Sequence, residues 1–372
     1  MHLERLIVKH ATEAQAREAV IRNAGHWGAR ANVSVDDFVG LYAIFRQGVF
    51  GRDGRLKTWV LVPEDNPETT EFYASCQVFT REVLILQPGQ ASPTSSFGHV
   101  VSAVLVPPEH RGKGYARRFM SLMHSVLAPH RYPNSPKAPT VDDRPSTVSV
   151  LYSAVGDYYS RCTPSEGESG WTLQKSLITT WLPPNFQLSP GTETPPIELL
   201  SESDVVATLD SDDSRIPVDL LELREKDPSK TYFAFVPTAP LNDFSVTMSK
   251  LFPGAPSDPS WGAKIPGGSD FMTWVYFRRS GLNLVVTRLR ASAESFPALL
   301  GAAFQVARDM GCEGVEIWNV PEHLAEIART TGGETTERDT NISALKWYGQ
   351  QPGSGVDHTD VVWALDERYS WC

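Results

Sequence analysis

The spacing of apolar residues changes along the chain, and these changes mark the expected strands and helices. Apolar and β-branched residues fill 100–106 almost without a break, which predicts a strand covered on both faces. Two prolines end this run, and a glycine-rich turn follows. From 116 to 126 apolar residues recur every three or four positions, as on one face of a helix. The stretch 98–127 therefore predicts a strand, a turn and a helix.

The same two patterns organise the rest of the first half. Thr12 and Gln15 form a capping box that predicts the start of a helix, and Ser34 is a good N-cap for another. The expected helices cover 12–23, 34–47 and 155–161, and the expected strands cover 6–8, 57–62, part of 72–86, 147–151 and the extended segment 171–181.

A proline-rich segment at 183–197 divides the chain, because so many prolines leave no room for regular structure. We expect a first domain at 1–182 and a second at 198–372. In the second half the expected helices cover 203–210, 218–226, 293–310 and 321–330, and the expected strands cover 271–278, 282–290, 314–319 and short stretches near 343 and 361. This order repeats the second half of the first domain without its glycine turn.

Composition narrows the class of protein. A length of 372 residues is ample for two cores, and a net charge of −10 argues against a nucleic-acid partner. No Lys/Arg run suggests a membrane surface, and the start of the chain lacks a secretory pattern, so we expect a cytoplasmic protein. The four cysteines are far apart and the histidines show no ligand spacing, so neither a disulfide framework nor a metal is expected.

The turn between the central strand and helix has the chemistry of an anion site. At the start of a helix several backbone amides lack intrahelical partners and point at one spot, which suits a phosphate. Gly112 and Gly114 let the backbone approach that phosphate closely. The P-loop pattern is absent, because Gly114 follows Lys113, and the dinucleotide pattern fails at Arg117.

The stretch resembles the acetyl-CoA motif [RQ]-x-x-G-x-[GA] of the GNAT N-acetyltransferases, which Arg111, Gly114 and Ala116 match. The resemblance implies an α/β GNAT fold with a mixed twisted sheet flanked by helices, followed by a GNAT-like domain that caps the acceptor site. It also implies acetyl-CoA as co-substrate. The residues it assigns to CoA are the strand end Val104, Leu105 and Val106 and the turn Arg111, Gly112, Lys113, Gly114, Tyr115 and Ala116.

The same resemblance assigns the general acid to Tyr159, in the segment that follows the next strand. A tyrosine with an ordinary pKa near ~10 stays protonated at neutral pH and can donate to the departing thiolate. Tyr158 is the neighbouring alternative. Thr163 and Pro164 stand where family members carry Gly-Phe.

The general base stays open. The motif strand carries Ser102 where family members often place an acidic residue or a histidine, which leaves His99, Glu82, a water chain ending at Ser102 or a group from the second domain. Two aromatic residues, Tyr369 and Trp371, lie within three positions of Cys372, and aromatic residues so close to the end are typical of a tail that packs against the protein. We therefore expect Tyr369, Trp371 and the carboxyl group of Cys372 to help form the acceptor site.

The segment Leu-Tyr-Ser-x-x-Gly-x-Tyr-Tyr-Ser at 151–160 and the aromatic tail narrow the resemblance to the fungal Lyc-type lysine N-acetyltransferases. This implies a small-molecule amine acceptor such as the side chain of free lysine, with Asp36 and Asp37 as candidate acidic contacts. The alternatives are a protein or histone acetyltransferase and a non-catalytic CoA-binding module. The acceptor and the oligomeric state stay undetermined.

Overall fold

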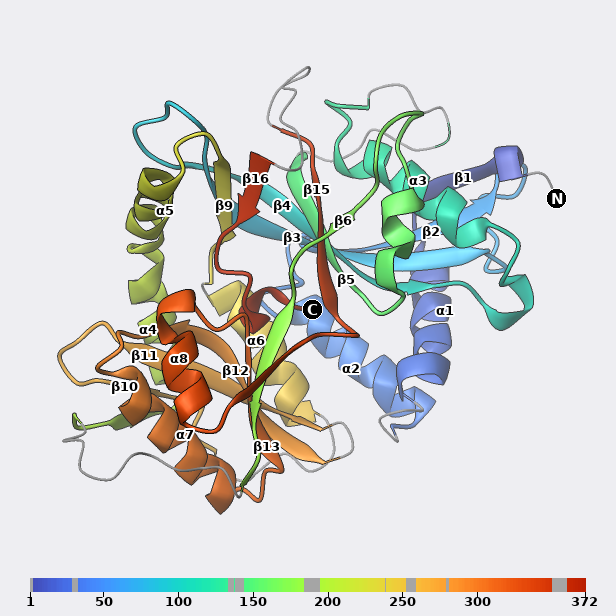
Figure 1. Cartoon of the computed structure of the whole chain (residues 1–372). Helices are drawn as coiled ribbons and strands as arrows, with labels where there is room; N and C mark the ends of the chain where they lie inside the picture. Colours follow the sequence, from blue (N-terminus) through green and yellow to red (C-terminus); the bar gives the residue numbers. More distant parts are fainter. Residues whose placement is uncertain are drawn as a thin grey trace.

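The structure is a computed structural model, and it describes residues 3–28, 33–132, 137, 144–183, 195–237, 239–251, 259–278, 281–349 and 360–372. Two twisted mixed sheets with helices packed against them make up the molecule (Figure 1). This confirms the expected α/β class. Residues 184–194, most of the expected linker, lie outside the described residues.

The first sheet has nine strands and contains the motif strand. Its main path runs β1 (Leu6–His10), β2 (Leu56–Pro63), β3 (Ala74–Leu86), β4 (Thr94–Leu105), β5 (Ser146–Ser153), β15 (Ile342–Trp347) and β6 (Thr172–Leu173). On its other side β9 (Thr231–Phe235) pairs with β3, and β16 (Val361–Trp363) pairs with β9.

The second sheet has seven strands and is built mostly from the second half of the chain. Its order is β14 (Glu334–Glu337), β7 (Leu177–Trp181), β13 (Gly314–Trp318), β12 (Leu282–Arg290), β11 (Phe271–Arg278), β10 (Gly262–Lys264) and β8 (Glu198–Leu200). The expected hairpin is β11 and β12, which pair antiparallel.

The two sheets exchange strands, and this corrects one expectation. The strands near 343 and 361 do not complete the second unit, because β15 pairs with β5 and β16 with β9 in the first sheet. Each added strand satisfies backbone groups that would otherwise form an open sheet edge. In return β7, which precedes the linker, pairs with β13 of the second sheet. The domain boundaries 1–182 and 198–372 stay a prediction about the order of units along the chain.

Side chains cap the first two α-helices at the residues that the sequence predicted. Thr12 and Gln15 form the expected capping box, and Ser34 accepts from the amide of Asp37. The α-helices are α1 (Glu13–Asn23), α2 (Val35–Gln47), α3 (Tyr115–Leu127), α4 (Glu202–Asp213), α5 (Ile216–Lys226), α6 (Ala239–Leu251), α7 (Phe296–Asp309) and α8 (Glu322–Thr330). A π-helical turn, η2 (Ala24–Gly28), and the 3-10 turns η1 (Leu3–Arg5), η4 (Pro108–His110), η5 (Gly156–Arg161) and η8 (Arg368–Ser370) accompany them. The segment expected as a short helix at 155–161 is thus the 3-10 turn η5.

Alternation along β4 divides its side chains between two cores. Val101 packs in a cluster with α3, whereas Val100 packs in a second cluster that includes Trp371 and Cys372. The C-terminus lies between the two sheets near the centre of the molecule (Figure 1). Since side chains alternate along a strand, Ser102 shares the face of Val100 and points toward the tail.

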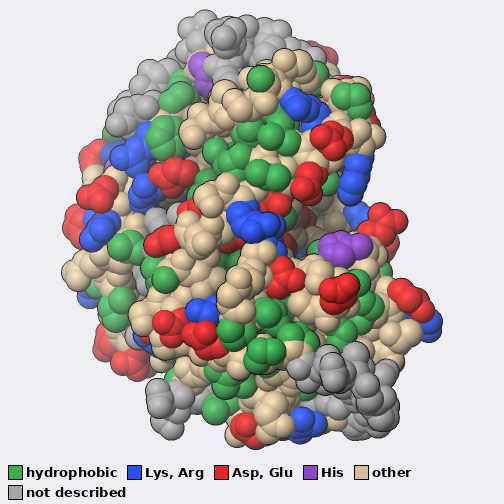
Figure 2. Space-filling view, turned by 90° about the vertical axis from the view of Figure 1, so that its left-hand side faces the viewer, with side chains coloured by type: hydrophobic (Ala, Val, Ile, Leu, Met, Phe, Trp, Pro, Cys, Tyr) green, Lys and Arg blue, Asp and Glu red, His purple; other side chains and the backbone are tan. Residues whose placement is uncertain are grey.

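On the face shown in Figure 2, acidic and basic side chains are interspersed, without the extended basic surface that nucleic-acid binding requires. In the described part of the chain, no helix combines the length and apolar character needed to cross a membrane.

Candidate active site

The turn before α3 has the geometry of an anion site. Gly114 is the N-cap of α3 with φ 84°, and no side chain caps the amides that follow it. Gly112 also has a left-handed φ of 73°, and a Cβ there would meet no atom within 4 Å. The turn 111–114 is exposed, so its backbone amides can reach a ligand from solvent.

Beside this turn, the end of β4 separates from its neighbour. β5 pairs with β4 from Phe97 to Val101, and the pairing ends there. Just beyond, the β3–β4 register shifts and Ala103 takes a left-handed φ of 50°, which is a bulge. The backbone beyond Val101 therefore has an open side where an extended ligand can pair with it.

The expected pantetheine residues differ in how accessible they are. Val104 and Val106 are half-buried and border the cluster around α3, whereas Leu105 is buried. The carbonyl of Val106 already accepts from Arg111 Nε at 3.1 Å. The first arginine of the motif thus ties the turn to the strand end.

A groove of about 1040 Å³ continues from the turn along α3. Gly114 is one of its walls, and four of its lining residues are basic: Arg117, Arg118, Arg131 and Lys137. The groove therefore offers positive charge beyond the turn, on the outer surface of α3.

Tyr159 and its neighbour Tyr158 both pack against the same hydrophobic cluster as Val104 and Val106. Burial raises the pKa of its hydroxyl, and the nearby thiols of Cys162 and Cys76 raise it further. Tyr159 is therefore protonated at neutral pH, as a proton donor must be. Burial also raises the pKa of Tyr158, so this property does not distinguish the two.

The structure brings Cys372 to the motif strand. Ser102 Oγ donates to the main-chain oxygen of Cys372 at 2.8 Å. Tyr369 is fully buried and donates to the Phe235 carbonyl at 2.8 Å, and Trp371 packs in the same cluster. Three residues that the sequence grouped as acceptor-site candidates thus lie together on one face of the first sheet.

Of the other candidates, Asp37 and Glu82 have structural partners. Asp36 and Asp37 are exposed at the start of α2, where Ser34 caps the helix. Glu82 makes a two-point ion pair with Arg55, at 2.9 and 2.6 Å. Burial alone would raise the pKa of Glu82, but the hydrogen bonds from Arg55 outweigh it and lower the pKa. A carboxylate held in this way is a poor general base.

Sequence reasoning missed two polar residues on the tail face of the first sheet, one buried and one half-buried. Arg81, on β3, is 1% exposed and lies close enough to Cys372 to act on its thiol: burial raises the pKa of that thiol to about 11, and Arg81 opposes the rise. Tyr152, on β5, shares a 2.7 Å hydrogen bond with Ser370. An arginine in the buried middle of a long strand was a signal that could have marked the first of them.

Within the part of the chain that the structure describes, no group of His, Cys, Asp and Glu side chains has the arrangement of a metal site.

The fold is similar to that of solved N-acyltransferase structures. The N-acetyltransferase from Kribbella flavida superposes with a TM-score of 0.50 at 16% identity, covering 92% of this chain and 71% of that one. A probable N-acyltransferase from Enterococcus faecalis V583 superposes with a TM-score of 0.56 at 11% identity, covering 92% and 73%. The fold is that of the GNAT acyltransferases.

Residues 182–372 match the family model described as the LYC1 GNAT-like C-terminal domain, and the chain belongs to this family. A curated relative, a lysine acetyltransferase from Yarrowia lipolytica, is 27% identical over 316 residues, an alignment that covers 74% of each protein. The chain is therefore a GNAT-type acyltransferase, and its family implies acetyl-CoA as the co-substrate.

Proposed function

We propose that this enzyme transfers the acetyl group of acetyl-CoA to a primary amine of a small molecule, either the side-chain amine of free lysine or a related amine metabolite. The uncapped glycine turn before α3, next to the open end of β4, is the observation that carries the proposal. The name of the Yarrowia relative supports lysine as the first acceptor to test.

The turn and the strand end would hold the two parts of CoA. The amides from Gly112 to Ala116 would bind the pyrophosphate, because α3 supplies no partners of its own for them. Backbone groups of Val104 and Val106 would pair with the pantetheine amides. The basic residues along α3, Arg117 and Arg118 among them, would attract the remaining phosphate.

The acceptor must lose protons for the transfer to occur. A lysine-type ammonium, with an ordinary pKa of ~10.4, costs about 4 kcal/mol to deprotonate at neutral pH. The neutral nitrogen then attacks the thioester carbonyl carbon, the C–S bond breaks, and the nitrogen gives up a second proton. One of the two protons ends on the CoA sulfur and the other is released to solvent, so the products are the acetylated amine, free CoA and one proton.

Two groups would carry out these proton transfers. Tyr159 would donate to the departing sulfur, since it is protonated and packs against the same cluster as Val104 and Val106. The carboxyl group that Cys372 carries in this chain would accept from the amine, with Ser102, its hydrogen-bond partner, linking it to the strand.

The thiols support direct transfer within a ternary complex rather than an acetylated enzyme. Burial raises the pKa of Cys162 to about 12, and the pKa values of Cys312 and Cys372 to about 11. Burial also raises the pKa of Cys76. A cysteine nucleophile needs to be a thiolate, and these four thiols are held protonated.

The tail favours a small acceptor over a protein. Tyr369, Ser370 and Cys372 are buried against the face of the first sheet beside Ser102. A protein substrate needs an open groove across this region for its backbone. Asp36 and Asp37 stay candidates for attracting a cationic amine, although their position at the start of α2 is explained by the helix dipole.

The test is the rate of CoA release with acetyl-CoA and a panel of acceptors: free L-lysine, lysine blocked at its side-chain nitrogen, a simple diamine and a lysine-containing peptide. We expect free L-lysine to have the highest kcat/KM and the side-chain-blocked form to be inactive. A peptide that is acetylated more efficiently than every free amine would show that the substrate is a protein.

A further inference from the structure

The tail, residues 366–372, is attached to both sheets. Six of its seven residues bond to six different parts of the fold. Asn319 Nδ2 donates to the Asp366 carbonyl (2.7 Å), and Arg288 Nη1 donates to Glu367 Oε1 (2.6 Å). The Tyr369 hydroxyl donates to the Phe235 carbonyl (2.8 Å), and Ser370 Oγ shares a hydrogen bond with the Tyr152 hydroxyl (2.7 Å). Trp371 Nε1 donates to Asn341 Oδ1 (3.2 Å), and the Cys372 oxygen accepts from Ser102 Oγ (2.8 Å).

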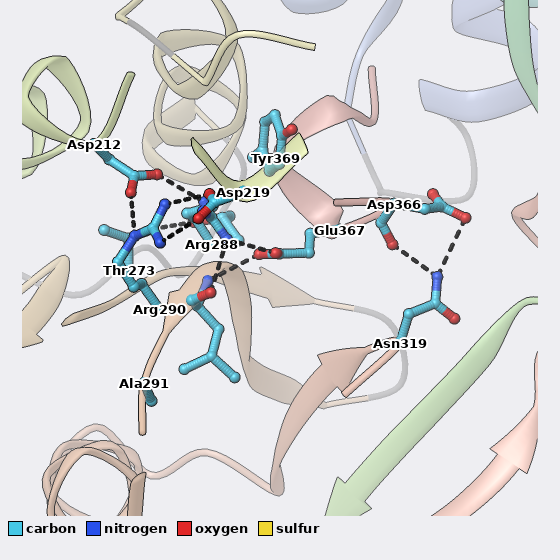
Figure 3. A network of polar contacts seen from close by, with 12 residues as sticks. Asp212, Asp219, Thr273, Arg288, Arg290, Ala291, Asn319, Asp366, Glu367 and Tyr369 are labelled. Atoms are coloured by element: carbon cyan, nitrogen blue, oxygen red, sulfur yellow. Dashed lines mark hydrogen bonds and ion pairs between the residues drawn. The ribbon is translucent and has the colours of Figure 1, made fainter. Parts of the chain in front are cut away.

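The second sheet and the residue that follows β13 supply most contacts at the start of the tail, and Ser343 of β15 also donates to Asp366 Oδ1 at 3.0 Å. Glu367 accepts from Arg288 through one oxygen and from the amide of Leu289 through the other, at 2.8 Å (Figure 3). Asn319 Nδ2 donates to both the carbonyl and the carboxylate of Asp366, at 2.7 and 3.2 Å. We call the contacts Arg288–Glu367 and Asn319–Asp366 the tail anchor.

The first half of the tail anchor belongs to a buried ion network. Arg288, with its side chain 2% exposed, also pairs with Asp212 of α4 at 2.9 Å. Asp212 in turn pairs with Arg290, which binds Asp219 of α5 through two hydrogen bonds (Figure 3). Arg288 is the member of this network that connects it to the tail.

Several residues at or next to these tail contacts have a left-handed backbone conformation. Among the described residues, five non-glycine residues have positive φ, and four of them are at the tail or its partners. Asn319 and Asn341 bond to the tail, Leu365 precedes it, and Ala103 follows Ser102. Such conformations are unfavourable and persist where the surrounding structure holds them, commonly at functional sites.

We propose that the tail anchor holds Trp371 and Cys372 at the open end of β4 in the position needed for acetyl transfer, which makes Arg288 and Asn319 positioning residues of the active site. The inference rests on the proposed function. The second sheet would then contribute to catalysis through the orientation of the tail, without a residue of its own at the reacting atoms.

Two variants weaken the tail anchor by independent routes. Glu367→Gln keeps the shape of the side chain and removes the charge that faces Arg288. Asn319→Gly removes the two bonds that Asn319 makes to Asp366, and glycine accepts the φ of 45° at this position without strain.

Each variant has a matched control. Asp219→Asn removes a carboxylate charge from the same ion network at Arg290, whose ion pairs are with Asp212 and Asp219 rather than with the tail. Asp53→Gly replaces another left-handed residue, at φ 58°, in the exposed turn before β2. The controls report what a lost charge in the ion network or a new glycine does by itself.

The experiment has three readouts on the full chain. The first is alkylation of Cys372 by iodoacetamide, mapped by mass spectrometry with the buried Cys312 as an internal reference. The second is the affinity for acetyl-CoA. The third is kcat with L-lysine. If the tail anchor positions the tail, both variants should alkylate faster at Cys372 and lose about tenfold or more in kcat, with acetyl-CoA affinity and both controls near the wild-type values.

Two results would overturn the inference. In one, Cys372 is alkylated in both variants no faster than in the wild type, so the anchor does not hold the tail. In the other, Cys372 becomes reactive while kcat stays the same, so the position of the tail does not matter for transfer. A wild-type enzyme that acetylates no amine would contradict the proposed function itself, and the alkylation rates would still decide whether the anchor holds the tail.

Discussion

Replacing Gly114 by valine should abolish acetyl-CoA binding and leave the fold intact. Gly114 has φ 84°, a conformation that costs an L-residue roughly 1–2 kcal/mol, and its Cβ would lie 3.3 Å from the Leu3 Cδ1 methyl. The backbone can relieve this strain by rotating the peptide groups on either side of residue 114. Those groups include the amides that must converge on the pyrophosphate.

The expected size of the effect follows from the bonds that are lost. A hydrogen bond to a charged group contributes roughly 1.5–3 kcal/mol, so two misdirected amides would lose about 3–6 kcal/mol of binding free energy. This corresponds to an affinity about 10²–10⁴-fold weaker. The loss exceeds the strain in the free protein, so binding should suffer far more than folding.

Gly89→Val is the matched control. Gly89 has φ 78° in the turn between β3 and β4, and a Cβ there would meet no atom within 4 Å. The substitution carries a similar backbone cost at a place with no proposed ligand. Both variants should melt a few degrees below the wild type, and calorimetry should show normal acetyl-CoA binding for Gly89→Val alone. Unchanged affinity in a folded Gly114→Val variant would refute the assignment of the turn.

Three further predictions test other parts of the account. Tyr159→Phe should lower kcat by about 10²–10⁴-fold in steady-state assays, with acetyl-CoA affinity unchanged, and a fully active variant would pass the role to another donor. Deleting residues 371–372 should reduce kcat/KM far more than the melting temperature, and a stable, fully active truncation would rule out a role for the end of the tail. Burial alone would raise the pKa of Glu168, but its hydrogen bonds with Tyr132 and Lys346 outweigh this and hold the pKa at about 2, below the usual 4.5. The stability that this adds is present above pH 4.5 and lost as the pH falls through 2, so the difference in unfolding free energy between wild type and Glu168→Gln should shrink on acidification in urea titrations.

Local structure around the motif could be predicted from the sequence because short-range chemistry determines it. The capping box at Thr12 and the N-cap at Ser34 were both confirmed, since a side-chain oxygen three residues before a free amide is a local arrangement. The strand, turn and helix at 98–127 were confirmed for the same reason. The left-handed Ala103 was not predicted, because the bulge depends on how β3 and β4 are paired.

The exchange of strands between the sheets could not be predicted in this way. β9 was missed, and its five residues are all buried, so its sequence has no alternating pattern to distinguish it from other apolar segments. The partners of β9, β15 and β16 lie far away in sequence, and local propensity carries no information about them. Strands that are so far apart in sequence pair because the folded protein leaves an unpaired sheet edge where they meet.

The residues of the candidate site also differ in whether a local sequence pattern could identify them. The glycine turn and Tyr159 were found from a local motif and a resemblance, and the packed tail from its aromatic composition. Arg288 and Asn319 gave no local signal, because a charged residue in one strand and an asparagine after another become meaningful only when Glu367 and Asp366 arrive beside them. The acidic pair at 36–37 attracted attention for its charge, although capping and the helix dipole explain it.

The most direct test of the central claim is to identify the product. The enzyme is mixed with isotope-labelled acetyl-CoA and excess L-lysine, and the labelled species are followed by NMR and mass spectrometry. We predict that the label passes to the side-chain nitrogen of free lysine as free CoA appears, with no label retained on the protein. Label that stays on acetyl-CoA with every amine of the panel, or that accumulates on the enzyme, would contradict direct acetyl transfer to a small-molecule amine.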